Sequence, residues 1–190
     1  MIEEWVQREI VASIDAKRAL LEDPDQMGRL QLALDLLRAA VDGGHRILIC
    51  GNGGSACDSL HIAAELVGQF RRRRRPYAAL ALVENVASLT AIANDISYDE
   101  IFSRQVEAFG LRGDVLLALS TSGNSRNVVS ACRRARELGL VVIGMAGAGG
   151  GAMTEWCDVS ICIPSLDVPH IQEAQMMLGH IMAAAAEERL

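Results

Sequence analysis

A glycine-rich segment followed by a histidine and a glutamate is the part of this sequence best suited to chemistry. Gly51 to Ser55 follows a short apolar run and precedes the segment 56–70, which has helical periodicity. A strand, a glycine turn and a helix N-terminus together present free backbone N–H groups to an anion. We expect Ser55 to be the N-cap residue of this helix and to add a hydroxyl donor. His61 and Glu65 are four residues apart, so they project from one helix face and could serve as an acid/base or metal-binding pair.

A purely structural interpretation of the same residues is also open. A glycine turn between a strand and a helix can be an ordinary connection, and the pattern is neither the Walker A motif nor the Rossmann fingerprint. His61 and Glu65 alone could form a surface pair on the helix.

A second polar loop favours the functional interpretation. The buried-strand pattern 114–119 is followed by Ser120 to Ser125, in which four of six residues carry a hydroxyl group, and then by a helical pattern at 126–138. A serine- and threonine-rich turn with an N-cap is the plain alternative. Because ligands of open α/β sheets bind at the carboxyl ends of the strands, we expect both loops to lie at one edge of the sheet.

Further motifs extend along nearly the whole chain. They are Cys50–Ser55, His61, Glu65, Asn94–Asp95, Phe102–Arg104, Gly113–Leu116, Ser120–Ser125, Ile171–Glu173 and His180. Together these motifs resemble the phosphoheptose isomerases, which are sugar isomerase (SIS) domain enzymes that act on sedoheptulose 7-phosphate. The serine-rich loop is typical of the whole SIS superfamily. The combination of His61, Glu65, Gln172 and His180 indicates the isomerase branch.

The resemblance implies roles for these residues in a ketose–aldose isomerisation through an enediol. Glu65 would be the base that takes a proton from carbon next to a carbonyl, and His180 would be the partner acid/base. The product would be D-glycero-D-manno-heptose 7-phosphate, made in the first step of heptose precursor synthesis for lipopolysaccharide or capsule. The implied substrate-binding residues are Asn52, Gly53, Gly54, Ser55, Glu65, Asn94, Asp95, Ser120, Thr121, Ser122, Ser125 and Gln172.

The resemblance also implies one zinc ion per subunit. Its ligands would be His61, Glu65, Gln172 and His180. Zinc takes nitrogen and oxygen ligands in a tetrahedral arrangement, although glutamine is an uncommon ligand. We expect no nucleotide and no redox cofactor.

The order of apolar segments predicts an α/β fold. Two amphipathic helices at 2–21 and 26–41 precede alternating strands and helices whose strands are almost continuously apolar, as in parallel sheets covered on both faces. Strands are predicted at 46–50, 78–83, 114–119, 140–145 and 158–163, and helices at 56–70, 86–93, 98–109, 126–138 and 169–188. We therefore expect one SIS domain over 1–190, with a helical part (1–43) and an α/β core (44–190). Its core is a doubly wound, five-stranded parallel sheet flanked by helices.

The first helix carries apolar residues that need a partner. These residues are Ile10, Val11, Ile14, Ala19, Leu20 and Leu21. They are too many for a free surface helix, so the helix packs on its own domain or on another subunit. The resemblance favours the second possibility, because phosphoheptose isomerases are homotetramers with active sites at subunit interfaces. We therefore expect the N-terminal helices to serve in oligomerisation.

Composition argues against a nucleic-acid-binding or membrane protein. The 190 residues carry a net charge of -6, which argues against a general nucleic-acid binder. No apolar run is long enough for a bilayer, and the first residues do not resemble a signal peptide, so we expect no membrane partner. The five cysteines have no CxxC spacing and indicate reduced thiols in a cytoplasmic protein.

Several local features have more than one interpretation. Arg71 to Arg75 could bind phosphate or RNA, but we expect a solvated helix end that stops at Pro76, from which one arginine could reach a ligand. The Gly147–Gly151 cluster predicts a flexible turn, and His170 an exposed histidine. Gln175 stands where many relatives have histidine.

Two alternative functions remain open at this stage. Gln69 stands where many relatives carry arginine, which puts one substrate contact in doubt. The loops would bind phosphate, and nothing in the sequence determines the length or stereochemistry of the sugar, so an isomerase of another sugar phosphate would also fit. A non-catalytic SIS protein that binds the bacterial replication initiator would share the loops but lack the counterparts of Glu65 and His180, so their presence favours an enzyme.

Overall fold

Five parallel strands form one sheet in the order β2-β1-β3-β4-β5. The structure is a computed structural model and describes residues 2–188. The strands are β1 (Ile47–Cys50), β2 (Ala79–Ala81), β3 (Val115–Ser120), β4 (Val141–Ala146) and β5 (Val159–Cys162). All five predicted strands and the doubly wound parallel sheet are confirmed. The chain order reverses between β1 and β3, so the crevice at their carboxyl ends is the expected ligand position.

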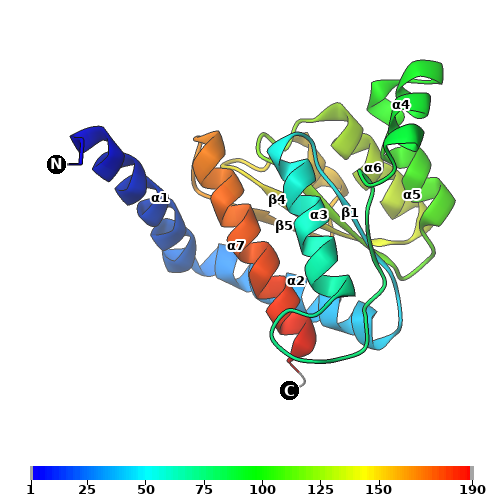
Figure 1. Ribbon diagram of the computed structural model, residues 1–190, viewed down its shortest axis with the longest axis horizontal. Coiled ribbons are helices and arrows are strands. Elements are labelled where there is room, and N and C mark those ends of the chain that lie inside the picture. The colour runs from blue at the N-terminus through cyan, green and yellow to red at the C-terminus, as the bar shows by residue number, and fades with distance from the viewer. Residues whose placement is uncertain (1, 189–190) are drawn as a thin grey trace.

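Helices cover both faces of the sheet (Figure 1). They are α1 (Glu4–Glu22), α2 (Pro24–Asp42), α3 (Gly54–Val67), α4 (Val86–Asp95), α5 (Ser103–Phe109), α6 (Arg126–Leu138) and α7 (Val168–Glu187), with short 3-10 helices η1 (Tyr98–Glu100) and η2 (Ala152–Trp156). The prediction of one helix over 98–109 is wrong. Ile101 and Phe102 separate η1 from α5 and bury their side chains in the core.

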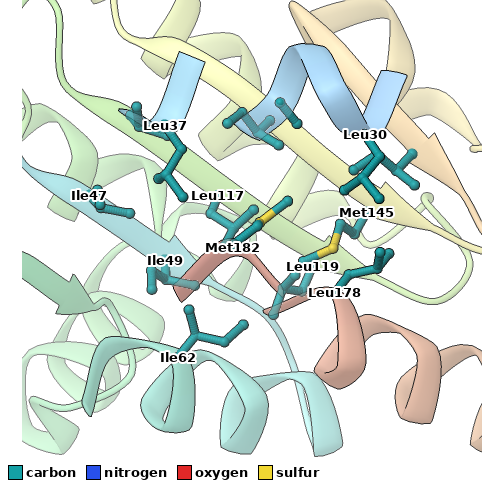
Figure 2. Packing of buried hydrophobic residues seen from close by; sticks show 14 of the residues in the cluster. Leu30, Leu37, Ile47, Ile49, Ile62, Leu117, Leu119, Met145, Leu178 and Met182 are labelled. Atoms are coloured by element: carbon teal, nitrogen blue, oxygen red, sulfur yellow. The ribbon is translucent and has the colours of Figure 1, made fainter. Parts of the chain in front are cut away.

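Alternate strand residues feed two hydrophobic clusters, one on each face of the sheet. Ile47 and Ile49 point to the α2, α3 and α7 side, whereas Leu48 and Cys50 point to the α5 and α6 side. Figure 2 shows the first cluster, in which Ile62 of α3 lies near the strands and α7. Because a strand side chain alternates between faces and both faces are covered, the strands are apolar throughout.

The helices α3 and α7 run parallel and in close contact. A Cβ atom on Gly179 would lie 2.6 Å from the Ile62 side chain, and one on Gly54 would lie 2.5 Å from the Gln172 amide. The bare glycines therefore allow the two helices to approach at both levels. This approach brings His180, the residue after Gly179, to the surface of α3.

A loop that carries the arginine run closes the far end of this helix pair. We call residues 68–78 the arginine loop. The Glu187 carboxylate of α7 accepts hydrogen bonds from the backbone N–H groups of Phe70, Arg71 and Arg72. It also pairs with Arg74 Nε at 3.1 Å, with only 2% of the Glu187 side chain and 10% of the Arg74 side chain exposed.

Arg74 is not the solvated arginine that the sequence predicted. Its guanidinium donates to the backbone carbonyls of Glu65, Leu66 and Gly68, where α3 ends. The last carbonyls of a helix have no partner within the helix, and the forked guanidinium supplies the missing donors.

The N-terminal helix α1 extends away from the sheet (Figure 1). Only Ala16 and Leu20 of α1 are buried, while Ile10, Val11 and Ile14 are about half exposed. The prediction of an exposed His170 is wrong, because its ring is buried where α1 meets α7 and lies 3.6 Å from Glu9 Oε2. Over residues 2–188, no helix has the length and apolar character needed to cross a bilayer.

The Glu187 contacts predict a pH-dependent stability. Burial opposes ionisation of this carboxyl, but the three N–H groups and Arg74 outweigh it, so the pKa of Glu187 lies below its ordinary value. A lowered folded-state pKa stabilises the protein above the unfolded pKa, and this is lost as pH falls through the folded value. We expect Glu187→Gln to lower the free energy of unfolding by about 2 kcal/mol at pH 7. The deficit should shrink below about pH 4.

Urea unfolding at neutral and acidic pH measures this difference. The exposed neighbour Glu188, changed to glutamine, is the matched control and should leave stability nearly unchanged. A deficit for Glu187→Gln that is the same at both pH values would contradict the assignment.

Candidate active site

Three predicted residues meet at the contact between α3 and α7. His61 Nε2 lies 3.2 Å from Glu65 Oε1 and 3.1 Å from His180 Nε2. Within residues 2–188, these three form the one group of His, Cys, Asp or Glu side chains that could hold a metal, with ligand atoms within 4.8 Å of one another. We call them the histidine cluster.

The donor atoms of the histidine cluster fit a divalent metal ion. Nitrogen and oxygen ligands about 2.1 Å from a tetrahedral zinc ion lie roughly 3.4 Å from each other. The observed separations from His61 Nε2 are 3.1 and 3.2 Å. Two imidazole nitrogens at such a distance must share a proton or a cation, because two lone pairs or two N–H groups repel each other.

Gln172 stays a predicted ligand. It precedes His180 by eight residues, or roughly 12 Å along the helix axis. Its amide lies over Gly54, at the beginning of α3. The structure therefore places Gln172 beside the glycine loop, where it was also predicted to bind substrate.

The arginine loop contacts two members of the histidine cluster. The Phe70 ring stacks on His180 with centroids 5.5 Å apart and an interplanar angle of 12°. Arg74 Nη2 donates to the Glu65 carbonyl at 2.8 Å. The arginine loop, whose backbone is bound by Glu187, thus contacts the cluster both at His180 of α7 and at Glu65 of α3. Sequence reasoning missed Phe70, whose position gives no chemical signal.

Asp58 is a further missed residue near the cluster. It lies one turn before His61 on α3, and its Oδ2 atom is buried without a hydrogen-bond partner among the described residues. Burial raises the pKa of Asp58, and the charge of His61 partly offsets this. The i, i+3 spacing from His61 is the sequence signal that could have identified it.

The beginning of α3 differs from its prediction. Gly53, with φ of 56°, occupies the N-cap position, and the helix begins at Gly54. Ser55 is therefore not the N-cap. It is buried in the first turn, where its hydroxyl donates to Gln175 Oε1 at 3.3 Å. A role of Ser55 in binding phosphate stays a prediction.

A pair of asparagines joins the two loops predicted to bind phosphate. Asn52 and Asn127 exchange side-chain hydrogen bonds of 2.8 and 2.9 Å. The Tyr98 hydroxyl also donates to Asn52 Oδ1 at 3.2 Å. Asn127, at the beginning of α6, is only 2% exposed and was missed. The pair holds the loops after β1 and β3 together at the expected crevice.

The serine-rich loop is organised by its own hydroxyl groups. Ser120 Oγ lies 3.1 Å from Ser125 Oγ, and Ser122 Oγ accepts from the Asn124 N–H group at 3.1 Å. The Thr121 carbonyl accepts from Gly147 at 2.9 Å. The hydroxyl groups thus gather at the carboxyl end of β3, as predicted.

Asn94 and Asp95 lie elsewhere, on the exposed last turn of α4. The Asn94 amide donates to the Asp95 carboxylate at 2.7 Å. Their contact with substrate stays a prediction.

The glycine cluster after β4 packs against the serine-rich loop. The Met153 N–H group donates to the Gly123 carbonyl at 3.0 Å, and a Cβ atom on Gly123 would lie 1.9 Å from the Gly150 carbonyl oxygen. The two loops therefore pack backbone against backbone, which only glycine permits. The prediction of flexibility overlooked that a tertiary contact, and not only a turn, can require glycine.

Similarity to known proteins agrees with this geometry. The SIS domain family matches residues 14–147. The phosphoheptose isomerase of Clostridium acetobutylicum is 45% identical over 98% of this chain and 95% of its own length. That of Rhodospirillum rubrum is 49% identical over 83% of this chain and 84% of its own.

The solved structure of phosphoheptose isomerase from Neisseria gonorrhoeae matches with a TM-score of 0.90 at 37% identity, covering 97% of both chains. The chain belongs to the phosphoheptose isomerase family. The SIS domain match contains both loops, His61 and Glu65, whereas His180 lies beyond it. The similarity to phosphoheptose isomerases covers nearly the whole chain and therefore extends to α7 as well.

The loop contact of Gly123 gives a test of the site's architecture. Gly123 has φ of 65° and faces backbone, whereas Gly149 has φ of 84° and nothing within 4 Å. We expect Gly149→Ala to lower the free energy of unfolding by about 1–2 kcal/mol, the conformational penalty alone. Gly123→Ala should lower it by about 2–5 kcal/mol, because the clash adds to this penalty. Urea unfolding measures both, and equal losses would contradict the backbone contact.

Proposed function

We propose that the protein interconverts sedoheptulose 7-phosphate and D-glycero-D-manno-heptose 7-phosphate. The observation that carries this proposal is the histidine cluster, in a member of the phosphoheptose isomerase family. The α3 helix connects this cluster to a glycine loop that lies at the crevice of the sheet. A phosphate site and a proton-transfer site on one helix suit an isomerase of a phosphorylated sugar.

The proposed reaction moves a proton between the first two carbons of the sugar. Glu65 takes the proton from the carbon next to the carbonyl, and His180 transfers protons at the oxygens while the enediol forms. The serine-rich loop and the glycine loop bind the phosphate through hydroxyl and backbone N–H groups.

Zinc is the proposed cofactor. His61, Glu65 and His180 would hold it. Gln172, the proposed fourth ligand, has its amide over Gly54 and would have to turn toward the cluster to complete the set. When bound, zinc supplies Lewis-acid polarisation of the substrate oxygens. The carboxylate of Glu65 has two oxygens, so one can face the metal site while the other remains able to accept a proton.

The active unit in this proposal is a homotetramer with its sites at subunit interfaces. The His61 side chain is 51% exposed, although proton-transfer sites normally exclude water. His180 lines an open cavity of about 730 Å³ whose other walls include Met176 and Ile181. The exposed apolar face of α1 likewise needs cover. A second copy of the chain would satisfy all three features.

The place of the reaction in the cell follows from the same proposal. The product would supply heptose precursors for lipopolysaccharide or capsule. The five cysteines are free thiols, which is typical of a cytoplasmic protein.

Two alternatives are weaker. An SIS protein that binds a replication initiator would not need the histidine cluster. An isomerase of another sugar phosphate would use the same cluster and loops, and only the family membership favours the seven-carbon sugar.

Substitution of the proposed base tests the function. We expect Glu65→Gln to reduce kcat by about 10²–10⁴-fold, because the amide cannot accept the proton. Product formation from sedoheptulose 7-phosphate is followed by NMR, with the exposed Glu155 changed to glutamine as a matched control. Unchanged turnover in folded Glu65→Gln protein would exclude Glu65 as the base. Inactive wild type would exclude the substrate.

Native mass spectrometry tests the metal and the assembly together. Protein purified without added metal or chelator should give a species of four chains with one zinc ion per chain. The His61→Ala variant should lose the zinc because one of the proposed ligands is missing. A metal-free wild type would refute the zinc proposal, and a stable monomer would refute the tetramer.

A further inference from the structure

The arginine loop concentrates positive charge in an acidic chain. The net charge is -6, yet five of the 18 lysine and arginine residues occupy positions 71–75. Arg71, Arg72, Arg73 and Arg75 are exposed. Because like charges repel each other, five adjacent arginines can hold a defined conformation only where negative charges or other contacts offset the repulsion.

The backbone of the arginine loop is fixed. The Phe70, Arg71 and Arg72 N–H groups donate to the Glu187 carboxylate at 2.9, 2.8 and 2.9 Å. Consecutive N–H groups that converge on one anion form a nest. The arginine side chains therefore project from a defined backbone.

Two of the five arginines are used within the protein. Arg74 pairs with Glu187 and lies over the Tyr77 ring at 4.0 Å, and Arg71 lies over Phe70 at 5.2 Å.

Besides Arg71, which only lies over a ring, three further arginines of the loop have no ionic partner within residues 2–188. Arg72, Arg73 and Arg75 make no ion pair with a carboxylate there, and the Arg75 guanidinium donates one hydrogen bond, of 3.3 Å, to the Val41 carbonyl. Their positive charges are therefore available to a ligand.

These side chains surround a cavity of about 470 Å³, within the range of small-ligand sites. Its lining residues are Asp42, Arg72, Arg73, Arg74, Arg75, Tyr77 and Glu187. Four arginines and two acidic residues thus line the cavity, and Arg74 already neutralises Glu187. The cavity that contains His180 shares none of these residues.

We propose that this cavity binds a small ligand that carries two or more phosphate groups. Two guanidinium groups can hold one phosphate through paired, charge-assisted hydrogen bonds, and a third arginine favours a second phosphate. Such a ligand differs from a sugar with a single phosphate. A nucleic acid fits less well, because its affinity requires many phosphate contacts and one short segment offers few.

Calorimetry with inorganic pyrophosphate tests this site. The wild-type protein should bind one pyrophosphate per chain at low ionic strength. The double variant Arg72→Ala/Arg73→Ala should bind at least about tenfold more weakly, or about 1.4 kcal/mol. Arg29→Ala/Arg112→Ala removes the same charge from exposed positions on other parts of the surface and should stay within about twofold. Circular dichroism checks that each variant is folded.

Four outcomes would overturn the proposal. The wild type could fail to bind pyrophosphate, or both double variants could bind it equally. Displacement of pyrophosphate by sedoheptulose 7-phosphate would move the anion to the glycine and serine loops. An RNA oligonucleotide that binds more tightly than pyrophosphate, with a steep salt dependence, would identify a nucleic-acid surface instead.

Discussion

The close parallel contact of α3 and α7 is the constraint on which the candidate site depends. Gly179 allows the helices to approach at Ile62, and Gly54 accommodates Gln172. The α3 helix carries His61 and Glu65, and α7 carries His180. If the two helices lay farther apart, the three side chains would no longer meet. Chemistry at this site is thus a property of helix packing, which in turn relies on both helices burying apolar side chains against one face of the sheet.

The ends of the same two helices are joined by polar contacts. The Glu187 carboxylate accepts hydrogen bonds from N–H groups of the arginine loop, and the Arg74 guanidinium donates to the last carbonyls of α3. These contacts also place Phe70 against His180. A buried ion pair is weak evidence for stability in general, because removing charges from water is unfavourable. Here its clearer consequence is geometric, since it defines where the loop stands relative to the cluster.

The sequence predicted the fold well because its signals were local. Continuous apolar runs located the strands, and i, i+4 spacing placed His61 beside Glu65. The errors concern residues whose roles depend on distant partners. Ser55 was predicted to be an N-cap but donates a hydrogen bond to Gln175. His170 was predicted to be exposed but lies between α7 and α1. Arg74 was predicted to be solvated but pairs with Glu187. Asn127 and Phe70 were missed because amide pairing and ring stacking across elements leave no periodic trace in a sequence.

The backbone contact between Gly123 and Gly150 affects the entropic cost of binding a ligand at the serine-rich loop. A loop that must become ordered on binding spends part of its interaction energy on lost conformational entropy. The serine-rich loop is instead braced by its neighbour in the free protein, through hydrogen bonds such as that from Met153 to Gly123. Its hydroxyl groups therefore already hold their positions, and a ligand that bound them would not have to order the loop first.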